Sequence, residues 1–187
     1  MRVAVYDKNP AGPGFAQWFL AVSWRAGCFI HKLFGLLDDY HGAATWDEAI
    51  EWLMRRPTPL SSIQFWGHGS PATIWLGGKM AGADRFMPLK AKVIVTSVLW
   101  FRVCSAFQGR AGQTFATRLA EGLGCTIAAH TRIIGVFQGG LHTAHPGTAP
   151  NWPESEGEFP PSFWASNGLK LGNNTIFCLR SKVPKGW

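Results

Sequence analysis

The stretch of sequence that decides the fold is residues 62–69, which read SIQFWGHG. The first five residues are mostly apolar or aromatic strand formers, and the glycine after them interrupts the run. The stretch therefore predicts a buried strand that ends at His68. A second apolar run, residues 98–103, reads VLWFRV and ends at Cys104 in the same way. We expect these two strands to present a histidine and a cysteine at their carboxyl ends.

Strand and helix patterns alternate on both sides of these two runs. Thr45 and Glu48 match a capping box, which predicts the start of a helix. We also expect strands at 2–6, within 28–37, at 73–76, at 125–129 and at 175–179, and helices at 15–25, 46–54, within 92–97 and at 112–124. This alternation predicts an α/β fold with a mostly parallel central sheet and helices on both faces.

The length of the chain, 187 residues, predicts a single α/β domain over 1–187. Within it, residues 139–173 are rich in Gly, Pro, His and Trp and show no periodic pattern. Such a composition predicts an irregular loop or lid. His142 and His145 fall in this range, and we expect them to be surface loop residues rather than metal ligands.

The composition bounds the class of protein and its partners. The chain is 47% hydrophobic and 16% charged, which is typical of a globular domain. Its net charge is +7, but the basic residues are scattered, so we expect no nucleic-acid partner. The apolar stretch 15–30 is short and contains Gln17 and Arg25, so we expect neither a membrane span nor a membrane partner. The four cysteines form no C-x-x-C pair, which favours a reduced, cytoplasmic setting. The sequence leaves the oligomeric state open.

Three polar residues, His68, Cys104 and His130, directly follow apolar runs. In a parallel sheet, functional groups gather at the carboxyl ends of the strands, so this coincidence predicts a site. An imidazole beside a thiol can stabilise the thiolate or protonate a departing amine. Gly67 and Gly69 leave room for an approaching peptide, and the N–H groups of Gly69 and Cys104 could form an oxyanion hole.

These residues resemble a known group of proteins. An apolar strand that ends in His-Gly, followed by a second strand that ends in cysteine, is the pattern of the caspase, legumain and gingipain superfamily. A closer resemblance is to an uncharacterised bacterial caspase-like domain family, on the Gly-His-Gly and Cys104 pattern. The motif G-x-x-F-x-x-x-L-A at 112–120 and Ala-His-Thr at 129–131 belong to the same resemblance, which covers about residues 60–140.

The resemblance implies a three-layer caspase-like fold and a cysteine peptidase that acts on a protein or peptide substrate. Cys104 would be the nucleophile and His68 the general acid/base, and the bond-breaking step would need no metal and no cofactor. Two other functions stay open. One is a non-catalytic peptide-binding module that uses the loop around Trp152 and Trp164. The other is a zinc-dependent hydrolase with His68, Cys104 and His130 as ligands.

The substrate-binding candidates point to opposite specificities. Arg102 and Arg132 flank the strand ends and could select acidic side chains, whereas the carboxylates at 154, 156 and 158 around Trp152 could form an acidic rim for basic ones. A solvated charge run also explains these carboxylates. His130 could line the substrate pocket or be a structural histidine.

Overall fold

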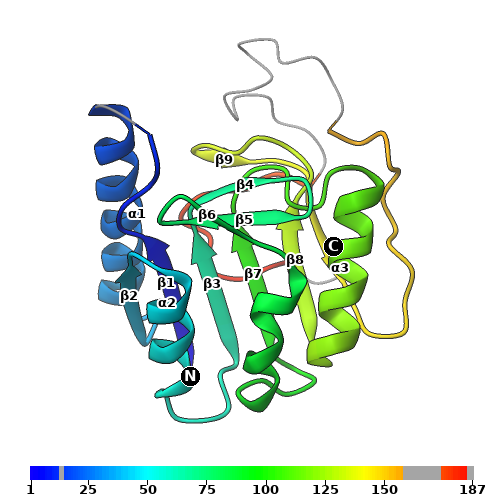
Figure 1. The fold of residues 1–187 in the computed structure, drawn as a ribbon, viewed down its shortest axis with the longest axis horizontal. Coiled ribbons are helices and arrows are strands. Elements are labelled where there is room, and N and C mark those ends of the chain that lie inside the picture. Colours follow the sequence, from blue (N-terminus) through cyan, green and yellow to red (C-terminus); the bar gives the residue numbers. More distant parts are fainter. Residues whose placement is uncertain (13–14, 158–173, 185–187) are drawn as a thin grey trace.

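The computed structural model describes residues 1–12, 15–157 and 174–184, and its fold is drawn in Figure 1. Its helices are α1 (Phe15–Leu33), α2 (Trp46–Met54), the 3-10 helix η1 (Ala83–Ala91) and α3 (Gly109–Leu123). Its strands are β1 (Arg2–Asp7), β2 (Asp39–Ala43), β3 (Ser62–Trp66), β4 (His68–Ser70), β5 (Thr73–Leu76), β6 (Lys79–Ala81), β7 (Val98–Arg102), β8 (Thr126–His130), β9 (Phe137–Gln138), β10 (Leu141–Ala144) and β11 (Ile176–Phe177).

Six strands form the central sheet in the order β10-β8-β7-β3-β1-β2. All neighbours are parallel except β10, which pairs antiparallel with β8. The predicted α/β class and the mostly parallel sheet are therefore confirmed. From β1 the chain continues to β2 on one side of β1, and it then crosses to β3 on the other side. The order in which strands are added to the sheet therefore reverses between β1 and β3. In open parallel sheets such a switch point leaves a crevice at the carboxyl ends of the strands.

The two faces of the sheet carry different coverings. Alternate residues of the strands, among them Val3, Ile63 and Phe101, pack into the main core with α2, η1 and α3. On the opposite face, Ala4 and Trp66 pack against α1 through Cys28. Farther along this second face, β7, β8 and β10 pack against the described C-terminal segment, residues 174–184. The period of two along each strand separates these clusters.

Local signals in the sequence fix two helix ends. The backbone N–H of Glu48 donates to Thr45 Oγ1 at 3.2 Å, and the Glu48 carboxylate accepts from the N–H of Ala44 at 2.8 Å. The predicted N-cap, Thr45, is thus confirmed at the start of α2, whereas the reciprocal bond of the expected capping box goes to Ala44, one residue before the N-cap. Helix α3 ends at Gly124, whose φ of 69° is left-handed and is adopted readily by glycine.

The prediction of a second strand within 28–37 is wrong. Helix α1 continues to Leu33 because Trp24, Cys28 and His31, at helical spacing, keep facing the sheet. The second strand is β2, which begins at Asp39. The helix predicted within 92–97 is also absent; this described stretch forms turns, and the helix before β7 is η1.

Part of the range predicted to be irregular, 139–173, is ordered into the sheet. Strand β10 lies within it and pairs Leu141 with His130. Residues 158–173 lie outside the described residues. The predicted edge strand at 175–179 is shorter than expected, since only β11 pairs, and it joins β9 in a separate two-stranded sheet. No helix in the described ranges has the length and apolarity needed to cross a lipid bilayer.

Candidate functional site

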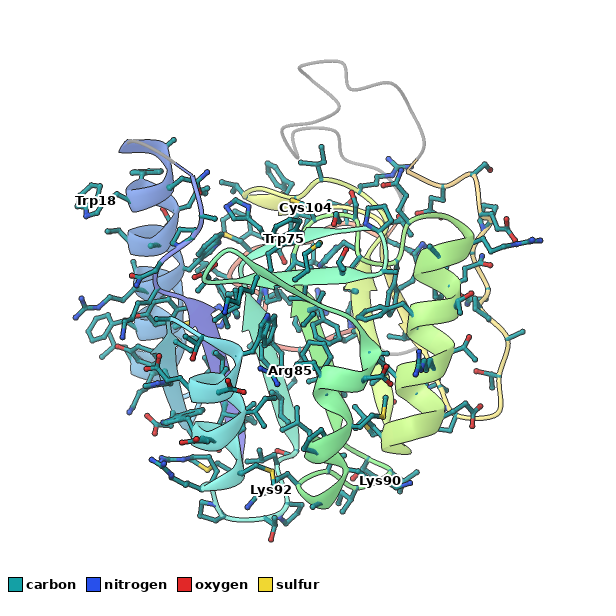
Figure 2. All side chains as sticks on the ribbon, viewed as in Figure 1. Trp18, Trp75, Arg85, Lys90, Lys92 and Cys104 are labelled. Carbon is teal, nitrogen blue, oxygen red and sulfur yellow. The ribbon has the colours of Figure 1, made fainter. Side chains whose placement is uncertain are left out.

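The parallel register of β3 and β7 brings the segments of His68 and Cys104 side by side. The last pair of this ladder is Trp66 with Arg102, so His68 and Cys104 each lie two residues beyond paired positions. Neighbouring strands lie about 4.8 Å apart. The contact continues past the strands, because a Cβ atom on Gly69 would lie 2.6 Å from the carbonyl oxygen of Cys104. Figure 2 shows Cys104 at the edge of the sheet where these strands end.

Helix α1 holds the His68 side chain. The Nε2 atom of His68 lies 3.0 Å from Gln17 Oε1, which makes Nε2–H the donor and leaves Nδ1 as the unprotonated nitrogen. The ring of Trp24 meets the imidazole edge-on at a centroid distance of 5.3 Å. Burial lowers the pKa of His68, and the charge of Asp7 opposes part of that decrease. The imidazole is therefore neutral at neutral pH and able to accept a proton.

A loop covers the Cys104 side chain. The backbone N–H of Ile134 donates to Cys104 Sγ at 3.5 Å, and the carbonyl oxygen of Ile134 lies 4.0 Å from the same sulfur. Burial raises the pKa of the Cys104 thiol, and the Ile134 N–H lowers it in part. Ser105, the next residue, has a φ of 54°, a left-handed conformation that turns the chain sharply toward α3. The sulfur is thus protonated, and the loop covers part of it, although residue 104 as a whole stays partly exposed.

The described C-terminal segment anchors this covering loop. Strand β9, which follows Ile134 in the loop, pairs with β11. The N–H of Cys178 also donates to the carbonyl of Val136 at 2.9 Å. The position of Ile134 over the sulfur therefore depends on residues near the end of the described chain.

Within the described residues, no hydrogen bond joins His68 to Cys104: Gln17 is bonded to the former and Ile134 to the latter. What the fold brings together is the pair of strand ends and their backbones.

The glycines beside His68 have a different role from the one expected. A Cβ atom on Gly69 would lie 2.5 Å from Val103 Cγ2 as well as against the Cys104 carbonyl. On Gly67 it would lie 3.1 Å from the carbonyl oxygen of Trp75. The space beside both glycines is taken by the protein's own chain rather than left open for a peptide. The use of the Gly69 and Cys104 N–H groups as oxyanion donors stays a prediction.

Asp7 is a residue of this site that the sequence analysis missed. It ends β1, next to β3, and its Oδ1 accepts from the N–H groups of Asn9 at 3.0 Å and Gly77 at 3.2 Å. Its Oδ2 is buried and has no hydrogen-bond partner among the described residues. Burial raises the pKa of this carboxyl. The signal was the one that identified His68, a polar residue directly after an apolar run.

Arg102 is enclosed rather than available to a substrate. Its guanidinium carbon lies 4.3 Å from the ring centroids of both Trp66 and Trp100. The guanidinium donates to the side-chain oxygens of Gln64 and Gln138 and to the carbonyls of residues 178 and 180. Burial lowers its pKa to about 9. These contacts hold the C-terminal segment against β7, so the guanidinium of Arg102 is occupied and is not available to select a substrate side chain.

His130 and Trp152 are also buried. The Nδ1 atom of His130 lies 3.1 Å from the carbonyl oxygen of Gly139, and burial lowers its pKa to about 3. The indole of Trp152 donates to the carbonyl of Phe107 at 3.0 Å and stacks on that ring and on His142. Both residues take structural positions, which favours the structural interpretation of His130 and removes Trp152 from an exposed binding loop.

The acidic residues near Trp152 are not a free rim. Glu156 accepts from His142 Nε2 and from Thr131 Oγ1, both at 2.9 Å, and Glu154 pairs with Arg110. Residue 158 lies outside the described residues. His142 is a buried residue of β10, contrary to the expectation of a surface loop.

Arg132 is half-buried, and its carbonyl accepts from the N–H of Ser105 at 3.0 Å. It is the one substrate-binding candidate that keeps a partly exposed side chain beside the Cys104 loop. No group of three or more His, Cys, Asp or Glu side chains within the described parts of the chain is arranged to hold a metal ion. The combination of His68, Cys104 and His130 as zinc ligands therefore has no support in the geometry.

Comparisons with known proteins give no match: no family model fits the chain, and no curated protein and no solved structure is similar to it.

Proposed function

We propose that this chain is a cysteine peptidase of the caspase-like kind, with Cys104 as nucleophile and His68 as general acid/base. The proposal includes the three-layer caspase-like arrangement of the fold, a cytoplasmic location, and a protein or peptide as substrate. It rests on the resemblance of the sequence motifs and on one observation of the fold. That observation is the register of β3 and β7, which sets the two residues at equivalent positions beyond adjacent strand ends.

The chemistry assigns each group a role. The neutral imidazole of His68 takes the thiol proton, and the Cys104 sulfur attacks the scissile carbonyl carbon to form a tetrahedral intermediate. The N–H groups of Gly69 and Cys104 stabilise its oxyanion. The imidazolium then gives its proton to the departing amine, which leaves a thioester on Cys104. Water, deprotonated by His68, hydrolyses the thioester and releases the carboxylic acid.

This sequence requires the sulfur to become accessible. The backbone of Ile134 occupies one side of Cys104 Sγ, so the loop must move before a peptide carbonyl can approach. The proton transfer also requires His68 to turn toward the sulfur from its bond with Gln17. We infer that the structure is the closed, substrate-free form of the peptidase.

A second function is supported by the burial of the thiol. The raised pKa of Cys104 and the covering by Ile134 are what a non-catalytic, peptide-binding relative would retain. In such a module the two strand ends would shape a binding edge without cutting the peptide. The surface for the peptide would not include Trp152, because this residue is buried.

A peptide-library digest separates the two functions. The full chain is incubated with a diverse peptide library, and the products are identified by mass spectrometry, with Cys104→Ala and His68→Ala run beside it. We expect cleavage by the wild type and a loss of at least about a thousandfold in either variant, as for other nucleophile and base deletions. Cys178→Ala is the control for loss of a thiol, because this cysteine is also partly exposed and its contacts with Arg102 and the covering loop are made by its backbone, so it should keep the activity. Equal products from wild type and Cys104→Ala would contradict the peptidase.

A further inference from the structure

The β4–β5 hairpin places a tryptophan directly beside His68. His68 of β4 pairs with Trp75 of β5, so the two side chains lie on the same face of the hairpin, with Cβ atoms about 5 Å apart. On the opposite face, Ile74 and Leu76 are buried in the main core. Because side chains alternate along a strand, Trp75 points away from that core, and it is only half-buried. In Figure 2, Trp75 and Cys104 lie at the same end of the sheet.

A second indole reaches His68 from helix α1. The ring of Trp24 meets the imidazole edge-on at a centroid distance of 5.3 Å, and Trp24 is also half-buried. The imidazole therefore lies between two elements that each contribute an indole. We call Trp24, His68 and Trp75 the aromatic face.

The polar groups of the hairpin beside this face are occupied by one another. The Nε1–H of Trp75 donates to Ser70 Oγ at 3.2 Å, and the hydroxyls of Ser70 and Thr73 share a hydrogen bond of 2.7 Å. These bonds fix the indole of Trp75 on the hairpin and leave mainly its carbon surface for a ligand. A polar side chain buried there would lose water without gaining a partner, whereas an aromatic ring packs well on another ring.

The charges around the aromatic face do not favour a cationic ligand. The carboxylate whose charge acts on His68 is that of Asp7, which is 1% exposed and accepts from the backbone N–H groups of residues 9 and 77. A cation on the surface therefore cannot pair with Asp7. Helix α1 adds Arg25 next to Trp24, and residues 15–33 contain no Asp or Glu. The face thus suits an uncharged, apolar side chain.

The role of His68 fixes which part of a substrate would meet this face. In the proposed mechanism the imidazolium gives its proton to the departing amine, and a general acid must come within about 3 Å of the atom that it protonates. That nitrogen belongs to the residue directly after the cut. The side chain of this residue therefore lies against whatever surrounds the imidazole, which here is the pair of indoles.

We propose that Trp75, together with Trp24, forms the subsite for the substrate residue directly after the scissile bond, and that this subsite selects an aromatic or large aliphatic side chain. The inference rests on the proposed function, because the role of His68 decides the side of the bond on which the subsite lies. The substrates are then peptides with Phe, Trp, Tyr or Leu at that position.

The test compares two substrates on each enzyme. A peptide that the full chain cleaves is synthesised with Phe or with Ala directly after the cut, and kcat/KM is measured for both. We expect the wild type to prefer Phe by about tenfold to a hundredfold, as an apolar pocket distinguishes side chains of different size. Trp75→Ala should reduce this ratio at least about fivefold, and Trp75→Phe should keep most of it. The ratio does not depend on the fraction of folded enzyme, because both substrates meet the same sample.

Trp52→Ala is the matched control. Trp52 is also an indole beside an imidazole, since it stacks on His41 at a centroid distance of 5.2 Å. It lies on α2 away from the strand ends, next to Arg56, whose partner Asp39 is the first residue of β2. This variant should keep the wild-type ratio. The subsite is overturned, while the peptidase stands, if the wild-type ratio is near one, if charged residues are preferred after the cut, or if Trp75→Ala keeps the wild-type ratio.

A binding measurement tests the subsite if the library digest gives no cleavage. The tetrapeptides Phe-Ala-Gly-Gly and Ala-Ala-Gly-Gly represent the amine-side product, and their binding to Cys104→Ala is followed by the NMR signals of the His68 imidazole. We expect the Phe peptide to shift these signals at a concentration at least about tenfold lower, and Trp75→Ala to remove the difference. That result without cleavage would reject the peptidase and keep the apolar subsite. Equal binding of the two peptides, or none, would then reject the subsite as well.

Discussion

The sulfur of Cys104 has a single hydrogen-bond donor among the described residues, the backbone N–H of Ile134 at 3.5 Å. That one neutral donor only partly offsets the burial that raises the pKa of the thiol. A thiolate is the reactive form of cysteine, so the closed structure holds Cys104 in its unreactive form at neutral pH. Any activity must come from a state in which the sulfur is less enclosed.

The alkylation rate of Cys104 should therefore be low at neutral pH and should continue to rise above pH ~8.5, where an ordinary thiol is half ionised. Iodoacetamide labelling followed by peptide mass spectrometry gives the rate at each pH. Cys178, which is partly exposed, provides an internal comparison in the same sample. If Cys104 reacted faster than Cys178 at pH ~7, the thiol would be ionised and the closed description would be wrong.

Asp7 influences His68 through its charge. Its carboxylate raises the pKa of His68 against the larger lowering by burial. Asp7→Asn keeps an oxygen at the acceptor position for the N–H groups of Asn9 and Gly77, so the turn after β1 should survive. We expect the variant to lower the pKa of His68 further, because the carboxylate charge that opposes the effect of burial is gone, as measured by NMR titration of the imidazole.

Asp38→Asn is the comparison for this measurement. Asp38 lies before β2 and pairs with Arg2, at the opposite end of the strands. This substitution should leave the titration of His68 unchanged. A rise of the His68 pKa in Asp7→Asn would mean that the two side chains do not interact as described.

At the scale of elements, the close approach of β4 to the segment after β7 depends on the absence of a side chain at residue 69. Gly69→Ala would place a methyl group 2.5 Å from Val103 Cγ2 and 2.6 Å from the Cys104 carbonyl oxygen. One of these atoms is backbone, so the strands must separate. We expect a loss of about 1–3 kcal/mol in the free energy of unfolding, as for other overpacked sites.

Chemical denaturation of Gly69→Ala and Gly82→Ala measures this difference. At Gly82, which caps η1, a Cβ atom would meet nothing within 4 Å, and its φ of −90° suits any residue. Gly82→Ala should therefore change the free energy of unfolding by less than about 0.5 kcal/mol in either direction. Equal effects of the two substitutions would show that strand packing at residue 69 is not tight.

At the scale of the whole molecule, buried histidines make stability depend on pH. Burial lowers the pKa of His130 to about 3 and that of His31 to about 4. In the unfolded chain both titrate near pH ~6.5, so below that pH the unfolded state binds more protons than the folded state. The stability present above pH ~6.5 is then lost as the pH falls.

For His130 alone, the free energy of unfolding should fall by about 2 kcal/mol between pH ~6.5 and pH ~5. Urea unfolding at several pH values gives the slope of the free energy of unfolding against pH. It is measured for the wild type and for His130→Asn, which keeps an N–H donor for the carbonyl of Gly139. This slope reports how many more protons the unfolded state binds than the folded state, and we expect that number to be smaller in the variant by about one. Parallel slopes would mean that His130 is protonated in the folded protein.

The sequence predicts the centre of this fold better than its edges. Buried strands such as β3 and β7 are continuous apolar runs with clear ends, and Thr45 and Gly124 mark helix ends by local chemistry. The site follows from the same runs, because parallel strands place their last residues at one edge of the sheet. The same property predicts, from the sequence, that the segments of His68 and Cys104 lie together.

The remaining features depend on contacts that are distant in the chain. The four residues of β10 have no period of their own and become a strand because β8 offers an unpaired edge. The burial of Arg102 requires Trp66 and carbonyls from the C-terminal segment, which are distant in the sequence, in addition to Trp100 two residues before it on β7. The sequence around Arg102, a charged residue at a strand end, therefore does not predict that its side chain is buried.

The anchoring of the Ile134 loop by β11 has a consequence for the order of synthesis. A ribosome makes β3, β7 and the thiol first, and residues 176–178, which hold the loop in place, come more than seventy positions after Cys104. Domains fold as they emerge during translation, so the sheet can assemble while the sulfur is still bare. The thiol is thus covered only after residues 176–178 have been made, and until then a nascent chain leaves its cysteine open to the cell's oxidants.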